Sequence, residues 1–158
     1  MWMGVALILS LAACDRSPEA AKKKLAAENV RVDEQTLLAK TKEGRAGEAT
    51  ATLLAQAGVD PNSRQANGMT ALMSAAFNGQ RDTAEALIKR GADVNATAKG
   101  FTALRLAVEK NDVNMVKLLL DHGANPTLKA DGSPSALEKA QEGGETEIVK
   151  LLKKKAGQ

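Results

Sequence analysis

Apolar residues recur along the chain at the spacing of one helix face, in pairs of short stretches. In one pair, Thr70 precedes the first stretch, where its hydroxyl can accept from the exposed backbone N–H groups of a helix start. Gly79 and Gly91 follow the two stretches, where a chain leaving a helix often adopts positive φ. The pattern therefore predicts two short helices joined as a hairpin. Their inward positions are Leu72, Ala75, Ala76, Ala84, Leu87 and Ile88.

The same pattern repeats from about Gly44 onward, with a period of about 32 to 33 residues. Thr102 and Asn111 stand where Thr70 and Gly79 stand in the preceding copy, and Gly123 stands where Gly91 does. Because Asn, like Gly, tolerates positive φ, the same backbone turn is expected at Asn111 as at Gly79. The first half of the unit occupies residues 67–76, 99–108 and, more loosely, 131–140, and the second half occupies 53–62, 86–95 and 118–126, with 147–152 beginning a further copy.

A period of this length, with Thr-x-Leu followed by Gly-Ala-Asp-x-Asn, resembles the ankyrin repeat, over about Glu34 to Lys155. The resemblance implies an all-α solenoid of about four helix-turn-helix units with short β-turn loops, preceded by a short N-terminal helix. It assigns residues 34–158 to the repeat domain. In such a stack each unit contacts only its neighbours, and the units together present a concave surface that binds other proteins.

The chain departs from the family pattern in several places. Ala71 and Ala103 replace the usual Pro, and the loops before Gly100 and Gly132 are each one residue short. The first unit, residues 34–62, lacks Thr-x-Leu and carries residues 44–47, which we interpret as a longer loop. We expect this unit to be an N-terminal cap. At the other end, Lys153 to Lys155 supply the polar face that a terminal repeat needs.

A further helix is predicted ahead of the repeats, from Pro18 to about Asn29. Ser17 and Pro18 form a favourable helix start, and strong helix formers follow. This helix either packs on the first repeat or serves as a spacer. Its lysines, residues 22–24, could touch anionic lipid headgroups, although a solvated helix face is the favoured interpretation.

Residues 1–13 differ from the rest because they are apolar and carry no charge. They are too few to span a membrane, which takes about 20 residues, but they suit the apolar core of a secretory signal. The segment ends in Leu-Ala-Ala before Cys14, which resembles the lipobox of bacterial lipoproteins. The resemblance implies a signal peptide at residues 1–13, acylation (palmitate among the acyl chains) of Cys14, and a lipidated N-terminus with a linker helix at residues 14–33.

Asp15, directly after Cys14, resembles a signal for retention in the inner membrane. The resemblance therefore favours an inner-membrane protein that faces the periplasm, with the outer membrane as the alternative. A second interpretation of residues 1–13 is a buried helix that happens to end in Cys. The absence of Lys or Arg at the start supports this second interpretation, unless the start codon is misassigned.

Composition excludes most catalytic chemistry. The chain has one Cys, one His, one Trp, two Phe and no Tyr, so neither a disulfide framework nor a His/Cys zinc site can form. A catalytic His could only be His122, which stands in a predicted turn and is expected to be structural or solvated. The net charge of +3 forms no basic stripe, which argues against nucleic-acid binding. We therefore expect no enzyme, no cofactor and no metal, and we disfavour an envelope hydrolase.

The ankyrin resemblance also implies which residues contact a partner: those beside each loop glycine and at the exposed end of each first helix. Phe77 and Phe101, the two Phe of the chain, both fall in this set, as does Met69. Aromatic anchors ringed by polar groups are typical of a binding hot spot, while the alternative is that either Phe folds inward. The full set is Arg64, Asn67, Met69, Phe77, Asn78, Lys99, Phe101, Glu109, Lys110, Asp131 and Glu142.

Together these features predict a membrane-anchored, periplasm-facing protein-binding module that is a monomer when unbound. Small bacterial ankyrin lipoproteins resemble, in architecture, immunity proteins that neutralise antibacterial effectors, some of which are phospholipases. The alternative role is a scaffold or accessory protein for a periplasmic or envelope enzyme. The partner's identity is not encoded in any of these motifs.

Overall fold

The structure is a computed structural model that describes residues 17–144 and 146–157. The predicted signal peptide, Cys14 and Asp15 lie outside the described residues. None of the described helices is both long and apolar enough to cross a membrane. The helices are α2 (Pro18–Ala27), α3 (Glu34–Lys42), α4 (Arg45–Gln56), α5 (Ala71–Phe77), α6 (Arg81–Lys89), α7 (Ala103–Glu109), α8 (Val113–Asp121), α9 (Ala136–Gly143) and α10 (Thr146–Ala156).

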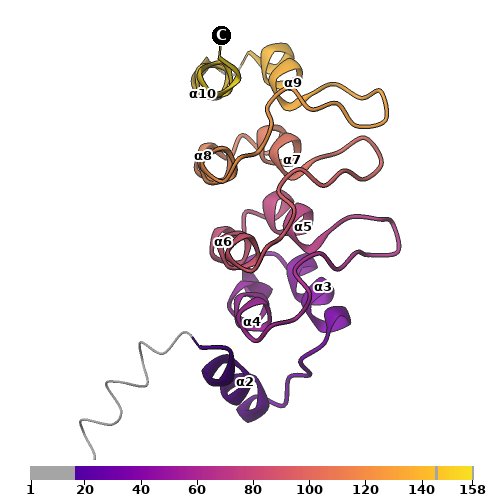
Figure 1. Cartoon of the computed structure of the whole chain (residues 1–158), viewed down its shortest axis with the longest axis vertical. Helices are drawn as coiled ribbons and strands as arrows, with labels where there is room; N and C mark the ends of the chain where they lie inside the picture. The colour runs from indigo at the N-terminus through magenta and orange to yellow at the C-terminus, as the bar shows by residue number, and fades with distance from the viewer. Residues whose placement is uncertain (1–16, 145, 158) are drawn as a thin grey trace, which may run out of the picture.

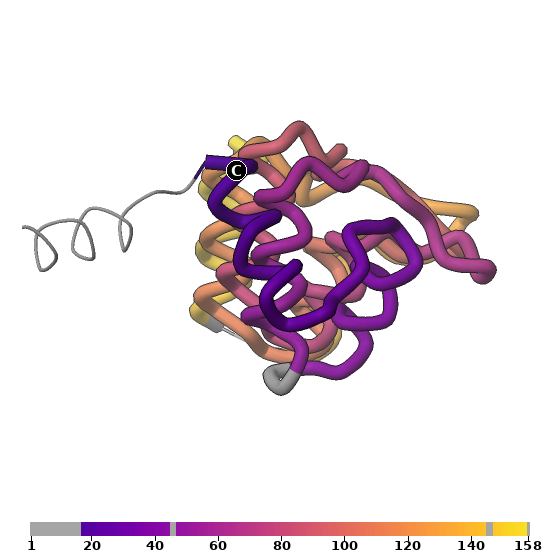
Figure 2. Tube along the Cα trace, turned by 90° about the horizontal axis from the view of Figure 1, so that it is seen from below, coloured from indigo at the N-terminus to yellow at the C-terminus, as the bar shows by residue number. Residues whose placement is uncertain are grey.

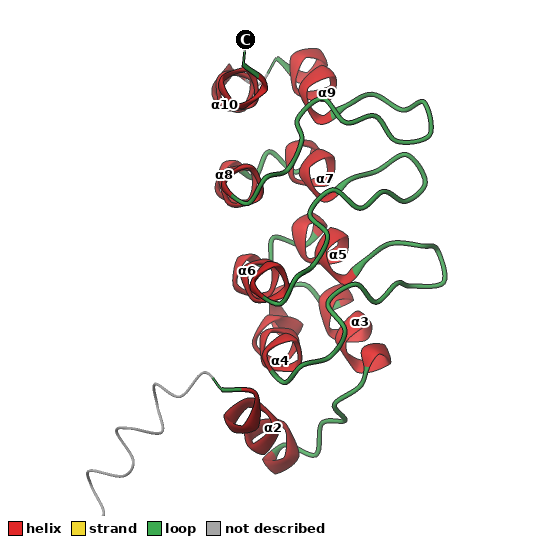
Figure 3. Ribbon diagram, viewed as in Figure 1, coloured by secondary structure: helices red, strands yellow, loops and turns green. Residues whose placement is uncertain are grey.

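The helices form two parallel columns, as Figure 1 shows. Helices α3, α5, α7 and α9 make one column, and α4, α6, α8 and α10 make the other. The long loops between successive helix pairs all project from the side of the α3–α9 column, which Figure 3 shows in green. Seen along the stack in Figure 2, these loops overlie one another. This arrangement confirms the expected all-α solenoid of helix pairs with a short helix in front.

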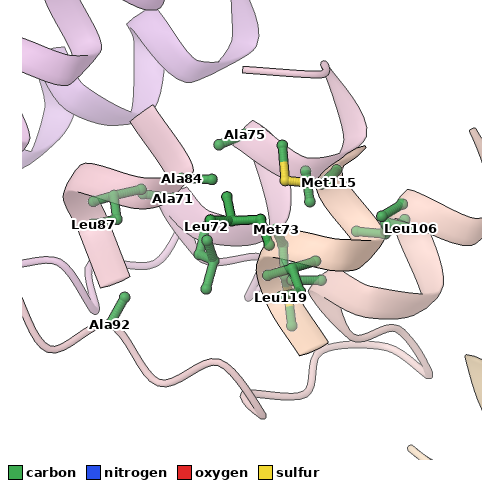
Figure 4. Packing of buried hydrophobic residues seen from close by; sticks show 14 of the residues in the cluster. Ala71, Leu72, Met73, Ala75, Ala84, Leu87, Ala92, Leu106, Met115 and Leu119 are labelled. Carbon is green, nitrogen blue, oxygen red and sulfur yellow. The ribbon is translucent and has the colours of Figure 1, made fainter. Parts of the chain in front are cut away.

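Small and aliphatic side chains fill the space between the columns. Leu72 and Met73 of α5 lie between Leu87 of α6 and Leu119 of α8, as Figure 4 shows, and all four are almost fully buried. Ala75 and its neighbours on the same face carry so little bulk that successive helices approach closely. Because each such side chain is enclosed, truncating one of the large ones to Ala costs about 2–5 kcal/mol.

Side-chain caps begin the first helices, as the sequence predicts at two of them. The backbone N–H of Met73 donates to Thr70 at 3.2 Å, and that of Arg105 donates to Thr102 at 3.1 Å. Helix α9 begins instead with a reciprocal capping box between Ser135 and Glu138. An ion pair with Lys129, and then the Ser135 backbone N–H, hold the pKa of Glu138 below its ordinary value.

The predicted left-handed positions are confirmed at the turns between helices. Gly79 has φ +67° and Asn111 has φ +52°, and each lets the chain leave a first helix and enter the second. Gly91 and Gly123 end the second helices with φ near +90°. These positions follow from local rules, because a residue without a Cβ, or an Asn, tolerates this region at low cost.

One local prediction is wrong: residues 44–47 do not form a longer loop. Only Glu43 and Gly44 separate α3 from α4, and Gly47 lies inside α4. Gly44 has φ +62°, which reverses the chain in that short space. The additional residues of this unit lengthen its helices, to 9 and 12 residues against 7 and 9 in the next pair. Gly47 is required here, because a Cβ on it would overlap the Lys40 carbonyl at the end of α3.

Helix α2 packs against α4 and so extends the stack by one element. It begins at Ser17 and Pro18 as predicted but ends at Ala27, earlier than Asn29. Ala21 and Leu25 are buried against the repeats, whereas the lysines at residues 22–24 are exposed. Of the two alternatives for this helix, packing on the first repeat is therefore the one that the structure adopts.

Two asparagines connect successive units through their loops. Asn62 donates to the Gly91 carbonyl at 3.2 Å and accepts from the Asp93 N–H at 2.8 Å. One unit later Asn95 makes the same pair of bonds, donating to Gly123 at 3.1 Å and accepting from Asn125 at 2.8 Å. These bonds fix the rise from one unit to the next and thereby align the loops that follow.

Replacing Gly100 with Ala is expected to destabilise the protein more than replacing Gly132 with Ala. Both glycines have positive φ at equivalent loop tips, so both substitutions share a backbone cost of about 1 kcal/mol. A Cβ on Gly100 would also overlap the Ser133 side chain of the next loop, whereas one on Gly132 would meet nothing within 4 Å. We expect about 1–3 kcal/mol more for Gly100→Ala, read from the midpoints of urea unfolding. Equal midpoints would show that the loops do not pack at this point.

Candidate protein-binding surface

A mostly apolar groove of about 400 Å³ lies between the α3–α9 column and the loops that precede α5 and α7. It is built from the last turns of α3, α5 and α7 and from the loops that precede α5 and α7. The loop before α5 presents Gln65 and Met69 to the groove, and the loop before α7 presents Phe101. The lining residues are Lys42, Gln65, Met69, Ser74, Phe77, Asn78, Phe101, Leu106 and Glu109.

Phe77, the last residue of α5, is the most exposed aromatic side chain of the groove. It is 41% exposed, and Val32 is the other large hydrophobic residue with this exposure in the part of the chain that the structure describes. The Lys110 ammonium lies over its ring, 3.8 Å from the ring centroid. An ammonium held over an aromatic face is stabilised by the ring's quadrupole, so one face of Phe77 is covered while the ring stays accessible from the groove.

Phe101 lies deeper, half-buried against the hydrophobic core. The Arg105 guanidinium lies 4.6 Å from its ring centroid and is also paired with Glu109 at 3.2 Å. A further bond from Arg105 to the Gly100 carbonyl, at 2.6 Å, holds the guanidinium beside the loop. Of the two Phe residues, Phe77 is therefore the exposed one, whereas Phe101 both lines the groove and completes the packing.

Four of the polar residues predicted as contacts make hydrogen bonds to backbone groups of the chain. Asn78 donates to the Thr41 carbonyl of α3 at 2.8 Å, and Asp131 accepts from the Gly100 N–H of the previous loop at 3.0 Å. Arg64 donates to Gly68 and Thr97 carbonyls, and Asn67 accepts from the Met69 N–H within its own loop. These side chains shape the loops and connect the units, which positions the groove.

The structure brings together about half of the predicted contact residues. Met69, Phe77, Asn78, Phe101 and Glu109 line one groove, and Lys110 covers Phe77 at its edge. The others lie elsewhere. Lys99, Asp131 and Asn67 are exposed at loop tips, and Glu142 lies at the end of α9, 3.4 Å from Lys139. Arg64 is also exposed, but it lies at the base of its loop and not at the predicted tip, because it forms a β-bridge with Thr70.

Sequence reasoning missed four lining residues: Lys42, Gln65, Ser74 and Leu106. Lys42 ends α3, so it occupies in the first unit the place that Phe77 occupies in the second. Because the first unit lacks Thr-x-Leu, the sequence could not be aligned to show that Lys42 and Phe77 are equivalent positions. Gln65 and Ser74 share a 2.5 Å hydrogen bond that joins the loop to α5, and only the three-dimensional structure reveals it.

The charge of the groove is unbalanced. Glu109 is its lining carboxylate, and Arg105 neutralises it. Lys42 and Lys110 have no ion pair among the described residues. No group of His, Cys, Asp and Glu in the described part of the chain could hold a metal ion, and His122 is exposed at the end of α8. The arrangement is suited to binding a macromolecular surface by apolar contact and charge.

Comparison with known proteins finds ankyrin repeats over most of the chain. A family model described as ankyrin repeats, in three copies, matches residues 9–98 and 37–130. The B-cell lymphoma 3 protein homolog of Mus musculus is 40% identical over 96 residues, which cover 60% of this chain and 21% of that protein. An ankyrin repeat-containing protein of Treponema pallidum is 49% identical over 61 residues, 38% of this chain and 20% of that protein. The chain therefore spans about a fifth of the length of these relatives.

Proposed function

The chain belongs to the ankyrin-repeat family, a generally non-catalytic fold whose repeats form protein-interaction modules, and on this premise we propose that it binds a partner protein through the groove around Phe77 while a lipid on Cys14 holds it at a bacterial membrane. The observation that carries the proposal is an exposed aromatic side chain, Phe77, in an apolar groove on the loop side of the stack.

Physical considerations support this use of the groove. An exposed Phe ringed by polar groups has the composition of an interface anchor, since aromatic residues that become desolvated supply much of the energy of an interface. Soluble surfaces rarely keep large apolar side chains together unless they bind something. The bonds made by Asn78 and Asp131 keep the groove in one shape, so little conformational entropy is lost on binding.

Site-specific photo-crosslinking in living cells tests the groove. A benzoylphenylalanine placed at position 77 is expected to form a discrete covalent adduct with one partner. The matched control places the same group at position 150, an exposed residue of α10 in the opposite column. Equal or absent adducts at both positions would refute binding at this groove.

The proposed anchor rests on the lipobox resemblance, which ends at Cys14. The first described helix begins at Pro18 and packs on α4, so a lipid at Cys14 holds the N-terminal end of the stack next to the bilayer. Replacing Cys14 with Ser is expected to move the protein from the membrane fraction to the soluble fraction. If the Ser variant still sediments with membranes, the lipid anchor is refuted.

For the biological role, we propose that the module neutralises an antibacterial effector in the periplasm, such as a phospholipase, and we keep a scaffold for an envelope enzyme as the alternative. A lipid anchor places an inhibitor beside the membrane that such an effector attacks. Deleting the gene is expected to make cells sensitive to attack by their siblings, and restoring it is expected to protect them. Full resistance of the deletion strain would exclude the immunity role and favour the scaffold.

A further inference from the structure

We propose that the groove selects an acidic segment of its partner, in which an apolar side chain that contacts Phe77 is flanked by carboxylates that pair with Lys42 and Lys110. This inference rests on the proposed function, because it specifies the chemistry of the partner segment. The juxtaposition that carries it is two unpaired lysines on either side of an exposed aromatic ring.

The positions of the three side chains follow from the repeat. Lys42 ends α3, Phe77 ends α5, and Lys110 follows the last residue of α7. Because α3, α5 and α7 succeed one another along the stack (Figure 1), the three residues form a row of cation, ring and cation along its axis. A partner segment that lies along the groove meets them in that order.

The cations that lie over the two aromatic rings of the groove differ in whether a carboxylate is paired with them. Arg105, which lies over Phe101, is paired with the carboxylate of Glu109. The net charge of this pair is close to zero, so it attracts a partner's carboxylate only weakly. Lys110 over Phe77 has no such partner among the described residues. The surplus positive charge is therefore at the Phe77 end, where the apolar surface is also most exposed.

The carboxylates that neighbour these two lysines in the sequence form no ion pair with them. Asp112 is two residues from Lys110, but its side chain accepts from the Met115 N–H at 3.0 Å and caps α8. Glu43, next to Lys42, is paired with Lys40 at 2.8 Å. An acidic partner thus gains two cations that the ring and the helix ends already hold in place, which favours carboxylates over lysines in the bound segment.

The test pans a phage-displayed library of short random peptides on the purified full chain. Peptides that combine acidic and apolar residues are expected to be enriched, and their synthetic forms are expected to lose affinity at high salt. In the variant Lys42→Glu with Lys110→Glu, their affinity is expected to fall about tenfold or more. The matched control, Lys150→Glu with Lys153→Glu, makes the same charge change on exposed residues of α10 and is expected to leave the affinity unchanged.

Several results would overturn the inference. Selection without enrichment of acidic peptides would do so, as would an equal loss in both double variants, which would reflect net charge alone. Peptides that depend on Phe77 but not on the lysines would refute the charge inference while the proposed groove stands. A dimer seen by sedimentation that the Lys42→Glu, Lys110→Glu variant dissociates would show that the occupant is a second copy. Because lysines at helix ends also offset the helix dipole, unfolding curves of each variant separate lost stability from lost affinity.

Discussion

Replacing Leu25 with Asp should detach α2 and lower the free energy of unfolding by about 3–5 kcal/mol. Leu25 is 0% exposed, and α2 contacts the stack through α4. In a linear array each element is stabilised only by its neighbours, so removing α2 uncovers the apolar face of α4 and weakens the first unit. The expected readouts are an earlier urea midpoint and rapid proteolysis between α2 and α3.

The matched control for this prediction is Lys24→Asp on the same helix. Lys24 is exposed, so the substitution introduces the same residue and a similar change in helix propensity without placing a charge in the core. We expect its effect to stay within about 1 kcal/mol. If the two variants unfold at the same urea concentration, α2 does not stabilise the stack despite its contact with α4, and it acts as a spacer rather than as a cap.

The parts of the fold that sequence reasoning predicted are those that local rules determine. Thr70 and Thr102 cap helices because a hydroxyl at that position satisfies free N–H groups whatever lies around it, and Gly79 and Asn111 turn left-handed for equally local reasons. The capping box of Ser135 and Glu138 was not predicted, although Ser-x-x-Glu is its sequence signature. The Asn62 and Asn95 bonds had a signal too, since a polar residue that recurs at the repeat period can bond the next unit.

What sequence reasoning could not predict depends on contacts between units. Residues 44–47 look like a loop because two glycines are close together, and only the approach of α4 to the Lys40 carbonyl explains Gly47 as a helix residue. Lys42 was missed as a groove residue because the first unit lacks Thr-x-Leu, so its equivalence to Phe77 becomes visible only where α3 and α5 end side by side in the stack. Asn78 and Asp131 were predicted by family position as contacts, and the structure shows that their side chains hold neighbouring units.

Replacing Gln80 with Glu should be among the most destabilising single changes in the repeats. Gln80 is 0% exposed, and its amide nitrogen donates to the Lys40 carbonyl at 3.2 Å and to the Gly44 carbonyl. It therefore holds the turn between α3 and α4 from the start of α6. A carboxylate there would face two carbonyl oxygens without a donor, at a cost of about 3–5 kcal/mol near neutral pH.

The cost of Gln80→Glu should depend on pH in a defined direction. Burial beside two carbonyls would raise the pKa of the new carboxyl in the folded state above its unfolded value of about 4.3. Below that unfolded value the carboxyl is protonated in both states and can donate, so the variant approaches the parent. As pH rises through the raised folded pKa, the stability is lost, because the folded state must then bury a charge.

Two controls separate the charge from the loss of the hydrogen bonds. Gln80→Leu removes the donor without adding a charge and should cost about 1–3 kcal/mol at every pH. Gln141→Glu makes the same substitution on an exposed residue of α9 and should have little effect. Urea unfolding at a series of pH values measures all three. If the deficit of Gln80→Glu did not shrink in acid, Gln80 would act by shape and not by donating to the α3–α4 turn.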